Sequence, residues 1–79
     1  MAYYVYKGEV NHPAYQLPFI IYYDAYEESV CITTLDMNAR KPSICQYQYP
    51  ARSLHDVRTL INKMGANGDS ILFKYYYLQ

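Results

Sequence analysis

The sequence predicts an α+β domain: a mostly antiparallel five-stranded sheet with one helix packed on one face, in the order β-β-β-β-α-β. Five runs are rich in Tyr, Val and Ile, which favour strands. A single segment has apolar residues at helical spacing. Short turn-forming segments join the first four runs, and such connections favour antiparallel pairing. The 79 residues fit a single domain, 1–79.

The first two expected strands are separated by a proline-containing loop. Residues 2–10 (AYYVYKGEV) form the first strand, in which Gly8 marks a bulge or a close backbone approach. Residues 11–18 contain two prolines, which cannot donate to a sheet ladder, and therefore form a loop. Residues 19–26 (FIIYYDAY) are β-branched and aromatic, so they form the second strand.

Three further strands are expected. Residues 30–36 (VCITTLD) form the third, and residues 44–49 (ICQYQY) form the fourth, which Pro50 ends. Residues 70–78 (SILFKYYYL) form the fifth. The second and fifth runs are apolar or aromatic on both sides, a pattern typical of central strands. The intervening helix allows the fifth strand to run parallel to the fourth or to take another place in the sheet.

The helix is expected over residues 54–64. Its apolar stripe consists of Leu54, Val57, Leu60, Ile61 and Met64. Ser53 precedes the stripe as the N-cap, and Asp56 suits both a capping box and the positive end of the helix dipole. Gly65 suits the left-handed residue that closes a helix.

This helix is too small to cover the sheet. It is about 16 Å long and 10 Å wide, whereas five strands span about 20 Å. We expect the helix stripe to meet Phe19, Ile21, Ile71 and Phe73. We expect the second face to carry an exposed patch of Ile20, Tyr22, Tyr26, Tyr76 and Leu78.

Tyrosine is the unusual feature of the composition, with 12 tyrosines, two phenylalanines and no tryptophan. A small domain has little interior in which to satisfy so many hydroxyl groups, so several rings are expected on the surface. Clustered exposed rings are typical of interfaces. The leading expectation is a non-enzymatic protein-binding domain, an inhibitor or adaptor that docks onto a larger protein or complex. Its contact residues are expected to be Tyr22, Tyr26, Tyr47, Tyr49, Tyr75, Tyr76 and Tyr77, with Arg40, Lys41 and Arg52 at a charged rim.

Other interpretations of the tyrosines remain open. Tyr pairs well across strands, so a Tyr-rich sheet can simply be a well-paired one. The surface can also join two copies of the chain in a homodimer. A third alternative is a module that stacks single-stranded nucleic acid on the sheet tyrosines. In size and architecture alone, the chain resembles small single-domain proteins, many of them phage-encoded, that dock onto a larger machine and block it.

The charges are segregated along the chain although the formal net charge is zero. Residues 1–39 hold five acidic residues and one basic residue, whereas residues 40–63 hold five basic residues and one acidic residue. Such asymmetry can orient a partner. The acidic set is as large as the basic one and repels phosphate, which makes nucleic acid a less favoured partner than protein.

The sequence contains no pattern that predicts catalysis, a metal site or a cofactor. His12 and His55 have no Cys or carboxylate at metal-ligand spacing apart from the adjacent Asp56. The three glycines do not have the spacing of a phosphate-binding loop. We therefore expect no enzymatic activity, no metal and no cofactor.

Cys31 and Cys45 allow one disulfide, and the hairpin register decides whether it forms. If residues 37–39 make the whole turn, the two cysteines face each other, and a cross-strand disulfide is conceivable. If the loop covers 37–43, they lie out of register. The start of the chain does not resemble a signal peptide, and no apolar run has the length of a membrane helix. We therefore expect a cytoplasmic protein with free thiols and no membrane partner.

Overall fold

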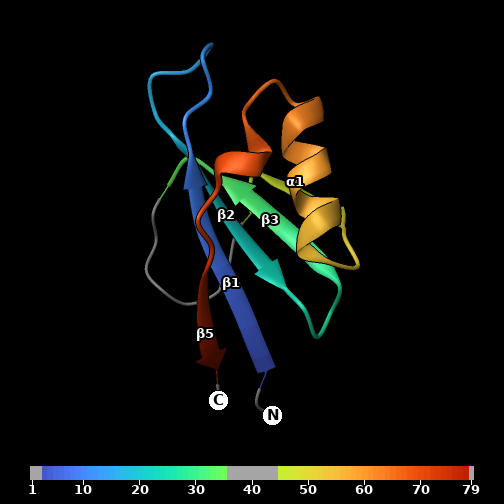
Figure 1. The fold of residues 1–79 in the computed structure, drawn as a ribbon. Helices are drawn as coiled ribbons and strands as arrows, with labels where there is room; N and C mark the ends of the chain where they lie inside the picture. Colours follow the sequence, from blue (N-terminus) through green and yellow to red (C-terminus); the bar gives the residue numbers. More distant parts are fainter. Residues whose placement is uncertain (1–2, 36–44, 79) are drawn as a thin grey trace.

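The computed structural model describes residues 3–35 and 45–78, and within these it describes only the backbone of Tyr3, Tyr4 and residues 76–78. The elements are β1 (Tyr3–Val10), β2 (Phe19–Asp24), β3 (Ser29–Thr33), β4 (Tyr47–Pro50), α1 (Leu54–Lys63), the 3₁₀ turn η1 (Gly68–Ser70) and β5 (Lys74–Leu78). The predicted element order is confirmed (Figure 1).

The strands form one antiparallel sheet in the order β4-β3-β2-β1-β5. The predicted α+β fold, with one helix after the fourth strand, is therefore confirmed. β2 is central, as predicted. β5 is not: it lies at an edge and pairs antiparallel with β1, and it does not run parallel to β4. The helical connection thus carries the chain from one edge of the sheet to the other.

The helix ends follow the sequence signals closely. The Ser53 hydroxyl accepts a hydrogen bond from the Asp56 N–H, which confirms the predicted N-cap. The Asp56 carboxylate accepts from the N–H of Arg52, one residue before the N-cap, so the capping box is displaced by one position. After Met64, Gly65 has a φ of +94°, the left-handed conformation expected of a closing glycine.

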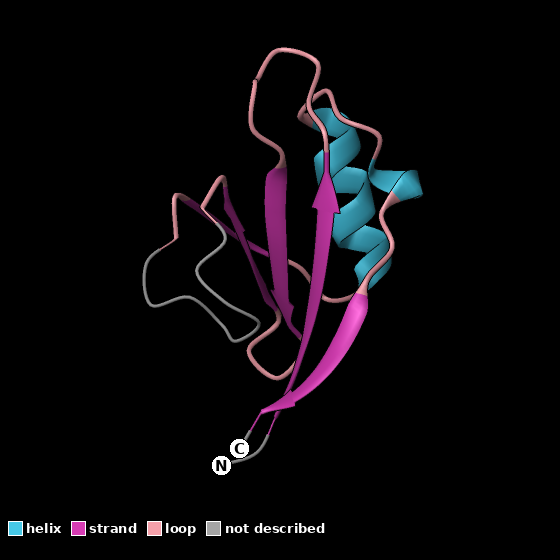
Figure 2. Cartoon of the chain, turned by 90° about the vertical axis from the view of Figure 1, so that its left-hand side faces the viewer, coloured by secondary structure: helices cyan, strands magenta, loops and turns pink. Residues whose placement is uncertain are grey.

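The helix packs on one face of the sheet, and the main core lies between them (Figure 2). Val57 and Ile61 of α1 are fully buried and belong to this core. The predicted sheet partners of the helix are all found there: Phe19, Ile21 and Ile71 are buried, and Phe73 packs against them half-buried. We call this side of the sheet the helix face.

Gly8 is the point where the 71–73 segment crosses closely over β1. A Cβ atom at Gly8 would meet the Cγ2 of Ile71 and would lie 2.9 Å from the Cδ1 of Phe73. The sequence predicts a bulge or a close backbone approach here, whereas the β1–β2 register runs through Gly8 without interruption and the approaching atoms belong to two core side chains. These side chains occupy the space that any other residue would need.

The sequence predicts that the fifth strand begins at residue 70, but β5 begins at Lys74. The contacts of Arg58 explain this difference. The Arg58 Nη1 donates to the backbone carbonyls of Gly68 at 3.0 Å, Asp69 at 3.3 Å and Ile71 at 2.9 Å. The guanidinium also lies 5.0 Å from the centre of the Phe73 ring. These contacts hold residues 68–71 against the helix, as the turn η1, and away from the sheet ladder.

The second face of the sheet carries a smaller buried cluster of Val5, Ile20, Tyr22 and Cys31, against which Cys45 packs. Cys31 and Cys45 form a disulfide with their Cα atoms 5.6 Å apart, so the expectation of free thiols is wrong. In the β3–β4 register, Cys31 lies opposite Gln48, which means that Cys45 reaches its partner from outside the strand. The sequence predicts Cys45 inside the fourth strand (residues 44–49), whereas β4 begins only at Tyr47.

The β2–β3 turn closes earlier than the sequence suggested. Asp24 is buried, and its carboxylate accepts hydrogen bonds from the N–H groups of Tyr26 and Glu27, both at 3.0 Å. Glu28 adopts a positive φ of 52° before the chain enters β3. Because Asp24 caps the turn in this way, Tyr26 lies in the turn and not in the strand.

Candidate protein-binding surface

Four tyrosines lie in one row across the helix face. In the strand registers, Tyr49 of β4 lies opposite Val30, Val30 opposite Tyr23, Tyr23 opposite Tyr6, and Tyr6 opposite Tyr75 of β5. Residues opposite each other in neighbouring strands share a face. The row therefore crosses all five strands, with one residue from each.

Tyr6 joins the rings at the β5 end of this row. Its ring centroid is 4.6 Å from that of Tyr75 and 6.1 Å from that of Tyr23. Tyr23 is buried, and burial together with the nearby charges of Glu28 and Asp56 raises the pKa of its hydroxyl above the ordinary value of 10.0. Tyr75 is 52% exposed, so the row passes from the core to the surface.

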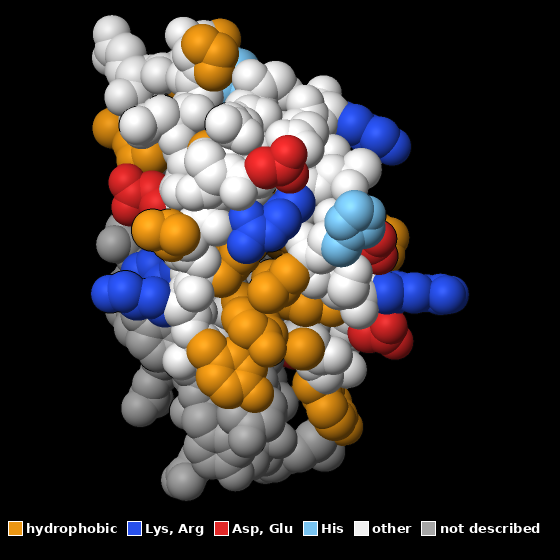
Figure 3. Space-filling model, viewed as in Figure 1, with side chains coloured by type: hydrophobic (Ala, Val, Ile, Leu, Met, Phe, Trp, Pro, Cys, Tyr) orange, Lys and Arg blue, Asp and Glu red, His pale blue; other side chains and the backbone are white. Residues whose placement is uncertain are grey.

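Phe73 extends the exposed end of the row. It is half-buried, and Arg58 lies over its ring at 5.0 Å. Figure 3 shows hydrophobic side chains gathered below η1 on this face, beside a basic side chain. We call Tyr6, Phe73 and Tyr75 the aromatic patch. Together with Arg58, whose guanidinium lies over Phe73, the patch presents aromatic rings and an arginine, which are enriched among the residues that contribute most to binding at protein interfaces.

The predicted contact tyrosines do not form one surface. Tyr22 is 2% exposed and belongs to the cluster on the second face, so its assignment to an exposed patch is wrong. Ile20 of the same predicted patch is also buried. Tyr47 and Tyr49 lie exposed on β4, whereas Tyr75 lies exposed on β5 at the opposite edge of the sheet. Tyr26 is 58% exposed in the β2–β3 turn.

The predicted charged rim is only partly described. Arg40 and Lys41 lie outside the described residues. Arg52 is exposed, and its backbone N–H donates to Asp56. Tyr76 and Tyr77 occupy β5 positions opposite Val5 and Tyr4, and their side chains lie outside the described part of the structure.

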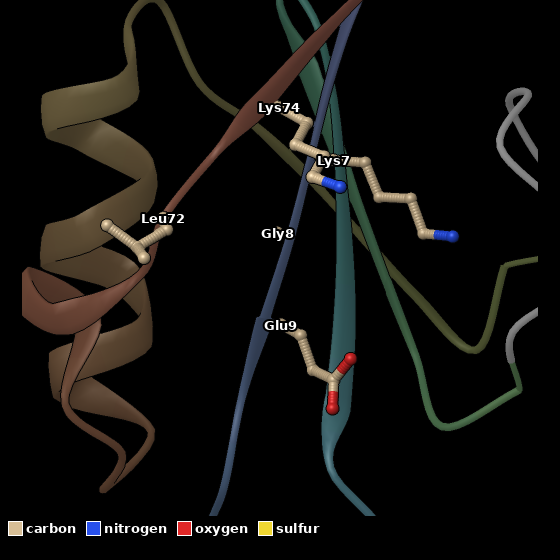
Figure 4. Close-up of a pocket in the computed structure, with 5 residues that line it drawn as sticks. All are labelled: Lys7, Gly8, Glu9, Leu72 and Lys74. Carbon is tan, nitrogen blue, oxygen red and sulfur yellow. The ribbon is translucent and has the colours of Figure 1, made fainter.

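A shallow groove of about 220 Å³ lies next to the same pair of strands. It is lined by Lys7, Gly8, Glu9, Leu72 and Lys74 (Figure 4). Lys7 and Lys74 are the last residues of the β1–β5 ladder and lie directly opposite each other. Leu72 is 88% exposed, the most exposed of the large hydrophobic side chains in the described ranges.

His12 has a structural role. The His12 Nδ1 accepts from the N–H of Ala14, so its Nε2 carries the proton and donates to the carbonyl of Met64 at 2.6 Å. This imidazole ties the β1–β2 loop to the end of the helix. Among residues 3–35 and 45–78, no group of three or more His, Cys, Asp or Glu side chains could hold a metal ion.

Four important residues of this region are not among the contact residues that the sequence predicts: Arg58, Leu72, Lys74 and Tyr6. In the sequence, Arg58 is one of the five basic residues of 40–63, and nothing in one sequence indicates which backbone carbonyls it bonds. Leu72 and Lys74 belong to a run that the sequence predicts as a central strand. Tyr6 could have been found, because it alternates with buried Val5 in a clear strand pattern.

Comparisons with protein-family models, curated proteins and solved structures found no match for this chain. In the described part of the chain, no helix has the length and apolarity needed to cross a membrane.

Proposed function

We propose that this chain is a non-enzymatic protein-binding domain whose contact surface is centred on the aromatic patch. The observation that carries the proposal is the pairing of half-exposed Tyr75 with Tyr6 at the edge of the sheet. Tyr6 packs in turn against buried Tyr23, so the patch is anchored in the core. Rings that are already fixed lose little conformational entropy when a partner covers them.

The position of β5 supports the same proposal. β5 is an edge strand, and its outer backbone groups have no neighbouring strand within the described sheet. Of its five residues, only Lys74 is charged, and none is proline. Proline and repeated charges are the usual protection of an edge against pairing, and β4 at the other edge is shorter and ends in Pro50. β5 is therefore the edge better suited to receive a partner.

Within this proposal, the chain acts as an inhibitor or adaptor that covers part of a larger protein or complex. Cytoplasmic location stays a prediction. The Cys31–Cys45 disulfide weighs against it, because disulfides are typical of oxidising compartments.

Quantitative capture with matched tyrosine variants tests the proposal. Wild-type protein, Tyr75→Ser and Tyr26→Ser are immobilised separately, and proteins retained from a lysate of the source organism are quantified by mass spectrometry. Tyr26 is the control, because it is exposed to a similar extent (58% against 52%) but lies in the β2–β3 turn. We expect a partner that wild type and Tyr26→Ser retain equally and that Tyr75→Ser retains about tenfold less.

The same variants also show which results would contradict the proposed contact surface. Circular dichroism first establishes that all three proteins have the same fold. A partner retained equally by folded Tyr75→Ser would refute the aromatic patch as the contact surface. Retention of nucleic acid in place of protein, with steep loss between low and moderate salt, would support the alternative module instead.

A further inference from the structure

We propose that an open pocket between the β2–β3 turn and the start of α1 binds an arginine side chain of the protein partner. This inference rests on the proposed function and names a charged anchor of the partner. The pocket has a volume of about 400 Å³ and is lined by Glu28, Pro50, Ala51, Arg52 and Asp56. Its two carboxylates, and the hydroxyl of a buried tyrosine next to them, carry the argument.

Glu28 is held beside the pocket by its backbone. It lies in the β2–β3 turn with a positive φ of 52°. Its carbonyl accepts a hydrogen bond from the N–H of buried Ala51 at 2.9 Å. The Glu28 side chain is exposed, and its carboxylate forms no hydrogen bond or ion pair with another described residue. An available carboxylate on a fixed backbone can bind a cation at little cost in conformational entropy.

Asp56 supplies the second carboxylate, from the first turn of α1. Its Oδ2 accepts a hydrogen bond from the backbone N–H of Arg52 at 3.1 Å, which orients the carboxylate. Arg52 is exposed, and within the described chain its guanidinium forms no ion pair with Glu28 or Asp56. The basic side chain of the pocket itself therefore leaves both carboxylates available to a second cation.

Tyr23 is the independent observation that points to a ligand. It is 3% exposed, and its hydroxyl has no hydrogen-bond partner among the described residues. Every enclosed side-chain oxygen or nitrogen atom of these residues has such a partner, so the Tyr23 oxygen must reach the surface. Burial and the charges of Glu28 and Asp56 raise the pKa of this hydroxyl, which places its opening beside the two carboxylates. The hydroxyl can there accept an N–H from a ligand.

The charges of this end of the molecule favour a cationic ligand. The β2–β3 turn carries Asp24, Glu27 and Glu28 and no basic residue, so that with Asp56 four acidic residues face Arg52 alone. A guanidinium suits the site better than an ammonium, because its planar fork can donate to two carboxylates and a hydroxyl at once. A metal ion is less suited, because no third His, Cys, Asp or Glu joins the carboxylates in the described ranges.

The pocket is continuous with the aromatic patch through Tyr23. The Tyr23 ring centroid lies 6.1 Å from that of Tyr6, which lies 4.6 Å from that of Tyr75. One segment of a partner can therefore cover the aromatic patch with apolar side chains and place an arginine in the pocket. Arginine and aromatic residues are the usual energetic centres of protein interfaces.

Two peptides that differ at one position test the pocket. The first is acetyl-Val-Thr-Arg-Val-Thr-amide, and the second has citrulline, an uncharged side chain of nearly the same shape, in place of Arg. Each is titrated into ¹⁵N-labelled full-length protein at low salt. We expect the arginine peptide to shift the amide signals of Glu28, Ala51 and Asp56, and the citrulline peptide to leave them unchanged. The shifts should decrease with added salt, because salt screens the attraction.

Charge variants of the protein complete the test. Glu28→Gln is expected to weaken binding of the arginine peptide by about tenfold. Glu9→Gln is the control, because it makes the same charge change at an exposed position of β1 outside the pocket. Tyr23→Phe removes only the hydroxyl and should weaken binding by a smaller factor. Arg52→Gln should strengthen binding, because it removes a like charge from the pocket.

Equal binding of the two peptides would overturn the inference, as would equal effects of Glu28→Gln and Glu9→Gln in variants that circular dichroism shows to be folded. Equal shifts of the pocket amides with calcium chloride alone, at the same concentration as the peptide, would also overturn it. The proposed function can survive each of these results, because it depends on the effect of Tyr75→Ser in the capture experiment. A failure of the pocket and a failure of the aromatic patch are thus distinguishable.

Discussion

Tyr6 and Tyr75 lie directly opposite each other in the β1–β5 ladder, with their ring centroids 4.6 Å apart and their planes inclined at 54°. The same Tyr6 ring lies 6.1 Å from buried Tyr23 on its other side. The central ring therefore connects the edge strand to the core. The exposed ring of the aromatic patch depends on this connection for its orientation.

We predict a measurable energetic coupling between Tyr6 and Tyr75. Aromatic pairs contribute about 0.5–1.5 kcal/mol beyond the area that they bury. The free energies of unfolding of Tyr6→Ala, Tyr75→Ala and the double variant, obtained from urea denaturation, should give a coupling in that range. The cycle of Tyr6 with Tyr26 is the control and should be additive within about 0.5 kcal/mol. Additivity in both cycles would show that the rings are only neighbours.

Arg58 is predicted to be the most important charged side chain for stability. Arg58→Ala removes the donor to three backbone carbonyls and the cation above Phe73, so unfolding should require about 2–3 kcal/mol less free energy. Arg58→Lys should recover only part of this loss, because an ammonium cannot reproduce the planar guanidinium contacts. Thermal and urea denaturation measure both effects.

Arg52→Ala is the matched control for Arg58→Ala. Arg52 is exposed, and the hydrogen bond to Asp56 is made by its backbone N–H, which alanine retains. The free energy of unfolding of Arg52→Ala should therefore lie within about 0.5 kcal/mol of the wild-type value. If the two alanine variants are equally stable, the role assigned to Arg58 in ending the β5 ladder is incorrect.

The sequence predicts local structure well where a short pattern determines it. The helix from Leu54, its Ser53 cap and the closing Gly65 are examples, since each depends on residues within one turn of helix. The start of β5 is the opposite case. Residues 70–73 have strand composition, but Arg58, 13 positions before Ile71 in the chain, bonds that carbonyl and keeps the segment out of the sheet. Such a contact between distant residues leaves no signal in a single sequence.

The predicted contact surface is partly wrong, again because contacts between residues that are distant in the sequence decide which side chains are exposed. The alternation of side chains along the predicted strands correctly places Phe73 on the helix face and Tyr22 on the second face. Because one helix is too small to cover five strands, the sequence predicts that the second face is exposed. In the structure, Tyr22 on that face is buried, and Cys45 packs against its cluster. Tyr75 was identified, but its ring partner Tyr6 was not, because which edge receives β5 depends on a crossover that the sequence left open.

The disulfide is predicted to be a major contributor to stability. Cys31 and Cys45 are 14 positions apart, and closing a loop of this length stabilises a folded chain by about 3 kcal/mol. Cys31→Ala/Cys45→Ala, or wild type with a reductant, should therefore unfold at a clearly lower urea concentration. Alkylation of the non-reduced protein followed by mass measurement is the direct check. Two alkylated thiols in the folded, non-reduced protein would contradict the disulfide.

Tyr23 should make the fold less stable at alkaline pH. Its burial and the charges of Glu28 and Asp56 raise its pKa above 10.0, so the folded state holds the phenolic proton more tightly than the unfolded state does. The contribution of the Tyr23 hydroxyl to the free energy of unfolding is fully present below the pKa of the unfolded state. It is lost as the pH rises through the pKa of the folded state. The free energy of unfolding, measured from about pH 9 to about pH 11, should fall less steeply for Tyr23→Phe than for wild type. Tyr47→Phe, which removes an exposed phenol, is the comparison; an equal change of slope in both variants would contradict the role of burial at Tyr23.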